Sequence, residues 1–230
     1  MPAAIISLFL FQNFWERDGW DHFHVEKSPE PESTYYDIHV ASRACDALER
    51  LQGDGPFALF VGFHAPHEPY ACRKNIGTIV ARTTSFCRST VPRMSSARNP
   101  QVTGGGSIIS NPCLGIVSIT MRTFGLGSRG YYSALKMVDD CIGTIYEKME
   151  ELNLLENTIV VFTSDHGEML GEHYLFNKNA TSYEGEIHIP FMIRFPDGWN
   201  AGKEFSQRGC AIDFFPTLMD LLGLDPDLPT

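Results

Sequence analysis

Paired cysteines, long apolar runs and an excess of positive charge are all missing from this chain of 230 residues. None of the six cysteines stands at Cys-x-x-Cys spacing from another, so the sequence gives no sign of a cysteine-based metal or redox site. No apolar run reaches the roughly 20 residues that cross a bilayer, and we therefore expect no membrane partner. The short apolar stretch Ile5–Phe11 has no basic residue before it, which fits a mature start or a truncated gene better than a signal peptide.

The balance of charge narrows the class of partner further. The formal net charge is −10, and no cluster of Lys and Arg of the kind that binds a phosphate backbone stands out in the folded parts of the chain. We therefore expect no nucleic acid partner. A small anionic substrate stays open, because a site can be locally positive inside an acidic protein.

Acidic residues are missing altogether from residues 71–128, although the chain as a whole is acidic. Arg, Ser, Thr and Gly dominate this segment, and no hydrophobic periodicity runs through it. A disordered loop explains this composition. A shifted reading frame explains it as well, because codons allowed for residues 75–87, read two bases on, can spell an acidic sequence typical of a folded domain. We divide the chain accordingly into 1–70, the irregular segment 71–128, and 129–230.

Outside that segment, helical and strand patterns alternate. Periodic apolar residues predict helices over residues 34–51, 131–152 and 212–222. Continuous or β-branched apolar runs predict strands over residues 57–63, 158–163 and 190–195. This alternation indicates an α/β fold with a mainly parallel sheet.

Ser164-Asp165-His166-Gly167 comes directly after the predicted central strand. Ligands of open α/β sheets bind at the carboxyl ends of the strands. There, Asp165 and His166 could offer an oxygen and a nitrogen to one divalent cation, and Gly167 would let the backbone turn beside them. The competing interpretation is a polar turn in which Asp165 only caps the backbone.

Three histidines and a lysine stand near the same predicted edge of the sheet. His64 and His67 follow the strand 57–63 in a proline-rich turn, and a rigidly held imidazole can protonate a leaving group. Lys178 could neutralise a tetrahedral oxyanion, and His173 lies between it and Asp165. Each is also compatible with a structural or solvated side chain when taken alone.

Taken together, these motifs resemble the sulfatases of the alkaline-phosphatase-like superfamily. The resemblance rests on two sequence motifs, Phe-Val-Gly-Phe-His-x-Pro-His-x-Pro-Tyr and Val-Phe-Thr-Ser-Asp-His-Gly-x-x-Leu-Gly-Glu-His-x-Leu-x-x-Lys. It covers about residues 20–70 and 130–228. Within the family the chain looks most like the iduronate-2-sulfatase-like branch. The resemblance implies a three-layer α/β/α fold, here incomplete, and hydrolysis of a small-molecule or saccharide sulfate ester.

The resemblance also implies a role for each matching residue. Asp165 and His166 would be ligands of a calcium ion, and Lys178 would contact the sulfate and the leaving oxygen. His67 would contact the sulfate and assist the leaving group. His64 and His173 would line the site and bind substrate.

The family's nucleophile and part of its metal site have no counterpart in the sequence. Its formylglycine arises from Cys or Ser within Cys/Ser-x-Pro/Ala-x-Arg, and no such string occurs; the run from Cys87 to Val91 is a near match that lacks the arginine at its fifth position. The family's first strand, which ends in an Asp-Asp pair that completes the metal site, is also absent, and the chain ends before the family's C-terminal subdomain. We expect a fragment of a sulfatase, inactive alone and poorly soluble.

Two other functions stay open at this stage. A phosphodiesterase or phosphonate monoester hydrolase of the same superfamily would differ mainly in the missing nucleophile segment. A non-catalytic binding domain, or pseudoenzyme, would fold cooperatively by itself. The sequence leaves the compartment and the oligomeric state undetermined.

Overall fold

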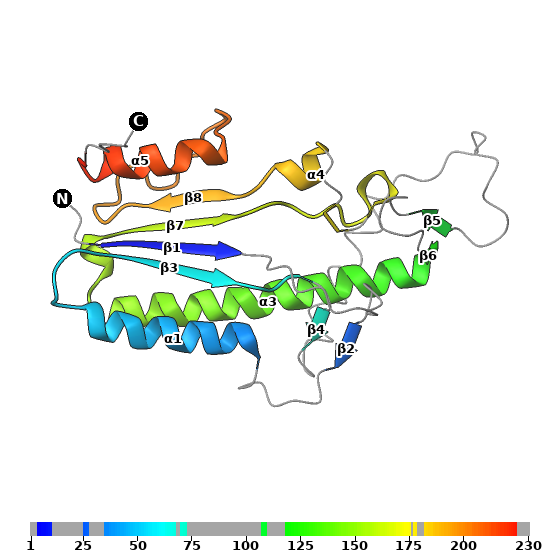
Figure 1. Ribbon diagram of the computed structural model, residues 1–230, viewed down its shortest axis with the longest axis horizontal. Helices are drawn as coiled ribbons and strands as arrows, with labels where there is room; N and C mark the ends of the chain where they lie inside the picture. The colour runs from blue at the N-terminus through cyan, green and yellow to red at the C-terminus, as the bar shows by residue number, and fades with distance from the viewer. Residues whose placement is uncertain are drawn as a thin grey trace, which may run out of the picture.

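The centre of the fold is a four-stranded sheet with the strand order β3-β1-β7-β8 (Figure 1). The structure is a computed structural model that describes residues 4–10, 25–27, 35–67, 70–72, 107–109, 118–175, 177–178 and 182–224. Strands β1 (Ala4–Leu10), β3 (Phe57–Phe63) and β7 (Thr158–Ser164) run parallel. Strand β8 (Phe191–Arg194) pairs antiparallel with β7 at one edge. The predicted α/β class with a mainly parallel sheet is confirmed.

The sequence pattern did not reveal strand β1. From the sequence alone, this apolar run is considered only as a possible signal peptide, yet the run forms the strand between β3 and β7. Leu10 pairs in register with both Phe63 and Ser164, so the three parallel strands end at one level. The residues that follow β3 and β7 therefore meet at the same edge of the sheet.

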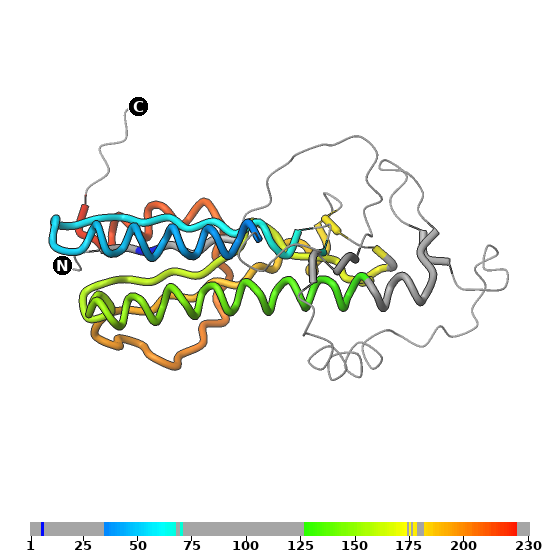
Figure 2. Tube along the Cα trace, turned by 90° about the horizontal axis from the view of Figure 1, so that it is seen from below, coloured from blue at the N-terminus to red at the C-terminus, as the bar shows by residue number. Residues whose placement is uncertain are grey.

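Helices cover both faces of the sheet, which makes three layers. Helices α1 (Tyr36–Leu51) and α3 (Met121–Glu151) lie side by side on one face, as Figure 2 shows. Their apolar stripes pack on the sheet in one core whose fully buried side chains include Leu48, Ile145 and Met149. Helix α5 (Phe214–Leu221) covers Ile159 and Val161 on the opposite face.

Helix α3 begins earlier than the sequence pattern indicates. It starts at Met121 rather than near Tyr131, so the last residues of the segment 71–128 are helical and not irregular. Three glycines near its start, at positions 125, 127 and 130, weaken the apolar periodicity there. Residues 73–106 and 110–117 lie outside the described part of the chain, and the two explanations for that segment stay predictions.

Shorter elements complete the described structure. They are β2 (Val25–Lys27) parallel to β4 (Tyr70–Cys72), β5 (Ser107–Ile109) antiparallel to β6 (Ser118–Thr120), the 3-10 turns η2 (Leu155–Asn157), η3 (Glu172–Tyr174) and η4 (Ala211–Asp213), and α4 (Glu184–Ile187). Among the helices described, none combines the length and the apolar character that crossing a bilayer requires.

Candidate active site

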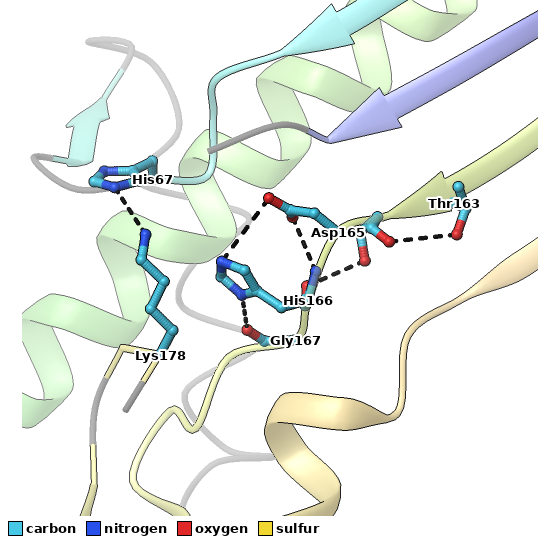
Figure 3. Close-up of polar contacts among 7 residues, drawn as sticks. His67, Thr163, Asp165, His166, Gly167 and Lys178 are labelled. Atoms are coloured by element: carbon cyan, nitrogen blue, oxygen red, sulfur yellow. Dashed lines mark hydrogen bonds and ion pairs between the residues drawn. The ribbon is translucent and has the colours of Figure 1, made fainter. Parts of the chain in front are cut away.

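Beyond the carboxyl ends of β3 and β7 lie four of the predicted site residues, His67, Asp165, His166 and Lys178 (Figure 3). His64 is the first residue after β3, and Asp165 is the first residue after β7. Lys178 reaches this edge from the loop that follows β7, and its side chain points at His67. The topology of the sheet thus brings two sequence-distant motifs together.

The turn after β3 holds two imidazole rings against each other. The His67 backbone N–H donates to the His64 carbonyl at 3.1 Å, which closes the turn. The two rings stack with their centroids 4.9 Å apart and their planes 28° from parallel. Tyr36 presents its ring edge-on to His64, with a centroid distance of 6.4 Å. The orientation of His67 is therefore set by packing as well as by the turn.

Asp37, a residue that the sequence motifs did not single out, fastens this turn to helix α1. The residue is 5% exposed, and its Oδ1 accepts the His64 N–H at 2.6 Å. Both carboxylate oxygens lie 3.3 Å from the Ala65 backbone nitrogen, which also donates to them. Burial raises the pKa of the Asp37 carboxyl, and the hydrogen bonds from His64 and Ala65 oppose that rise.

His67 and Lys178 form a polar pair. The Lys178 Nζ lies 3.2 Å from the His67 Nε2. An ammonium group can only donate, so Nε2 is the acceptor and the neutral ring carries its proton on Nδ1. The pair thus places a positive charge and a hydrogen-bonded imidazole beyond the carboxyl ends of the parallel strands.

The loop that carries Lys178 is closed by Glu168. The Glu168 Oε1 accepts the backbone N–H of Leu170 at 3.2 Å and that of Asn177 at 2.5 Å. Asn177 directly precedes Lys178, so the carboxylate fixes the backbone next to the lysine. Like Asp37, Glu168 was not among the residues that the sequence motifs singled out.

Gly167 is required by packing rather than by a sharp turn, which corrects the sequence-based expectation. Its backbone N–H donates to the Glu186 carbonyl at 2.7 Å. A Cβ at this position would overlap the Gly185 carbonyl oxygen. Its φ is not among the positive values of the chain, so the left-handed freedom of glycine is not used here.

Asp165 and His166 fit a cation. The His166 Nδ1 lies 2.6 Å from the Gly167 carbonyl oxygen, which can only accept, so Nδ1 carries a proton. The opposite nitrogen, Nε2, is buried without a hydrogen-bond partner among the described residues and lies 4.0 Å from the Asp165 Oδ2. In the neutral ring, Nε2 thus offers a lone pair beside a carboxylate oxygen, although no cluster of three or more ligating side chains occurs in the described part of the chain.

His173 lies apart from these contacts, on the turn η3. Its ring stacks on that of Tyr183 with a centroid distance of 4.0 Å, and its Nε2 is 3.9 Å from the Glu172 Oε1. About half of the His173 side chain is exposed, at 52%. A role in lining the substrate site stays a prediction for this residue.

Comparison with known proteins agrees with the motifs and the fold. The sequence profile of the family described as Sulfatase matches residues 8–224. Arylsulfatase K from dog is 30% identical over 178 residues, which is 73% of this chain and 32% of that protein. Choline-sulfatase from Rhizobium meliloti is 27% identical over 196 residues, or 82% of this chain and 37% of that protein. The chain thus spans about a third of the length of these relatives.

Solved structures show the same fold. The candidate sulfatase yidJ from Bacteroides fragilis superposes with a TM-score of 0.63 and 27% identity, covering 85% of this chain and 38% of that one. The phosphonate monoester hydrolase of Agrobacterium radiobacter superposes with a TM-score of 0.66 and 24% identity, covering 87% and 41%. The three-layer architecture, the paired motifs at the sheet edge and the matching profile agree, and the chain belongs to the sulfatase family.

Proposed function

We propose that this chain carries the cation-binding half of the active site of an enzyme that hydrolyses sulfate esters. The observation that carries the proposal is the buried, unpartnered His166 Nε2 beside Asp165, at the sheet edge that also holds the His67–Lys178 pair. Asp165 and His166 would hold a divalent cation, and the hard carboxylate oxygen favours Ca²⁺. When bound, the cation would stabilise negative charge on the sulfuryl oxygens.

His67 and Lys178 have complementary tasks in this proposal. The Lys178 ammonium would neutralise charge on the sulfate and on the leaving oxygen. Because its Nζ is 3.2 Å from the His67 Nε2, the pair can relay a proton to the departing alcohol without a rearrangement of the backbone. His64 and His173 would line the substrate site, His64 by holding the His67 ring through their stack.

The substrate class is a sulfate ester of a small molecule or a saccharide. The names of arylsulfatase K and choline-sulfatase support the ester class, and they point to different alcohols. The run His-x-Pro-His-x-Pro-Tyr that begins at His64 supports placement in the iduronate-2-sulfatase-like branch. The substrate would be anionic, in keeping with the Lys178 charge.

We expect the chain by itself to show no turnover. Its sequence contains no Cys/Ser-x-Pro/Ala-x-Arg string from which a formylglycine could form, and two protein ligands hold a hard cation weakly. The test is release of nitrophenol from a nitrophenyl sulfate by the purified chain in excess CaCl₂. Release above the rate of a Lys178→Met variant would contradict the expectation, because turnover requires a nucleophile and the sequence contains no formylglycine string that could supply one.

Two alternatives have less support. A phosphodiesterase or phosphonate monoester hydrolase would share the fold, and the Agrobacterium neighbour, at 24% identity, bears on the fold alone. A pseudoenzyme would bind but not turn over. The first alternative is tested by titrating the chain in CaCl₂ with inorganic sulfate and, separately, with phosphate, while the His67 ring signals are followed. We expect sulfate to shift these signals at the lower concentration.

A further inference from the structure

The His67–Lys178 pair joins two separate segments of the chain, and the hydrogen bond between the two side chains does not by itself fix either backbone. His67 stands on the turn after β3, and Lys178 stands on the loop after β7. A hydrogen bond of 3.2 Å between two such segments requires both backbones to be fixed. Each is tied by a carboxylate that makes its hydrogen bonds to backbone N–H groups of the segment.

Asp37 ties the histidine segment. It comes from α1, and it accepts the N–H groups of His64 and Ala65, the residues with which the turn opens. The side chain is almost fully buried, and burying a carboxylate costs free energy unless it is well hydrogen-bonded. The two backbone donors offset that cost and at the same time set the direction in which the turn leaves the strand.

Glu168 ties the lysine segment. Its Oε1 joins the N–H groups of Leu170 and Asn177, which stand on either side of the turn η3. Its charge also lies close enough to the partly buried Tyr131 of α3 to add to the rise in the pKa of that hydroxyl, which burial chiefly causes. The carboxylate thus lies near α3 while it closes the loop next to Lys178.

We propose that Asp37 and Glu168 are positioning residues for the His67–Lys178 pair. The proposal rests on the proposed function of that pair. Neither carboxylate donates to or accepts from the pair in these hydrogen bonds; each sets the position of the backbone that carries one member. Removal of either carboxylate separates the two side chains, whereas Asn or Gln keeps an acceptor oxygen and keeps the pair.

The test follows the His67 ring nitrogens of the ¹⁵N-histidine-labelled full chain by NMR, at a pH where the ring is neutral. The His67 signal is identified with His67→Gln. In the unaltered chain we expect the Nδ1–H tautomer, with Nε2 accepting from Lys178, and we expect Lys178→Met to abolish it. Asp37→Ala and Glu168→Ala lose the tautomer in the same way, while Asp37→Asn, Glu168→Gln and the control Asp46→Ala keep it. Asp46 stands on the same helix as Asp37, half exposed and paired with Arg43.

Retention of the Nδ1–H tautomer in folded Asp37→Ala or Glu168→Ala overturns the proposal, because a purely structural carboxylate would lower stability and leave the pair intact. If an alanine variant does not fold, amide hydrogen exchange in the unaltered chain decides. Protected amides at His64, Ala65, Leu170 and Asn177 support the proposal, and exchange at unstructured rates overturns it. Both readouts are independent of turnover, so a failed sulfatase assay leaves the inference standing.

Discussion

At the level of single residues, the buried carboxylate of Asp37 combines a cost with a function. Its oxygens are almost fully withdrawn from solvent, and two backbone donors satisfy them. Deleting the side chain leaves the His64 and Ala65 N–H groups buried without a partner, which costs more than the net value of the hydrogen bonds. The residue is therefore sensitive to truncation even though it carries a desolvation penalty.

We expect Asp37→Ala to lower the free energy of unfolding by about 1–3 kcal/mol, the usual cost of leaving buried backbone donors unsatisfied. Asp37→Asn should cost less, because its amide oxygen can still accept from the His64 nitrogen. Urea unfolding followed by circular dichroism measures both. The exposed Asp46→Ala is the matched control, and an equal loss in the control would show that the effect is helix propensity and not the buried contact.

The pH dependence of stability should carry the signature of the same group. The pKa of Asp37 is raised in the folded state above its ordinary value of 3.8, so the folded chain binds a proton more tightly than the unfolded chain. The contribution of Asp37 to stability therefore falls as pH rises from about 3.8 through the raised value, and stays constant above it. We expect stability relative to Asp37→Asn to fall over this window. A difference that rises with pH would contradict the assignment.

At the level of elements, two glycines of α3 should respond in opposite ways to alanine. A Cβ at Gly130 would stand 2.6 Å from the Tyr70 Cβ, so helix α3 and strand β4 would have to move apart. Gly143, in the same helix, has no atom within 4 Å of the place a Cβ would take. Gly130→Ala should destabilise by roughly 1–3 kcal/mol, whereas Gly143→Ala should stabilise by up to about 1 kcal/mol. Thermal unfolding of both variants is the measurement, and a stabilising Gly130→Ala would contradict the packing of β4 on α3.

The elements also show how far the sequence predicts this fold. The strand Phe57–Phe63 and the helix that ends at Leu51 are found as predicted, because long apolar runs and periodic stripes leave little choice. Strand β1 is an apolar run of the same length as β3, but it stands at the start of the chain without the preceding periodic helix and turn that mark β3, and the sequence pattern therefore did not identify it. Asp37 and Glu168 were missed for a different reason: their partners are backbone N–H groups, which no side-chain motif encodes, and an acidic residue in a first helical turn is ordinary.

At the level of the whole molecule, the sheet is covered unevenly. On one face of the sheet, α5 packs on β7 and β8 but not on β3, and Phe60 of β3 is therefore 55% exposed. Phe191 and Met192, on strand β8, are at least half exposed. An apolar cavity of about 490 Å³ lies between α3 and this strand, lined by Leu135, Val138, Asp139, Ile142, Tyr146, Val160, Phe162, Met192, Ile193 and Arg194. Exposed apolar surface on this scale favours self-association.

We expect the chain to associate in solution at micromolar concentration, and Met192→Lys to slow the association, because a lysine on a sheet edge blocks further strand pairing. Light scattering over time measures this. Gln207→Lys adds the same charge in an exposed loop and should have little effect. An equal reduction by both variants would assign the effect to net charge rather than to the β8 surface.

The most direct test of the account is a titration of the ¹⁵N-histidine-labelled chain with CaCl₂, with NaCl of matched ionic strength as the control. We expect a saturable shift of the His166 Nε2 signal, with a dissociation constant in the millimolar range (on the order of 1 mM) because the site has few oxygen ligands, and loss of that shift in Asp165→Asn. A His166 signal that CaCl₂ leaves unchanged, in a chain that remains folded, would contradict the assignment of Asp165 and His166 as the cation ligands.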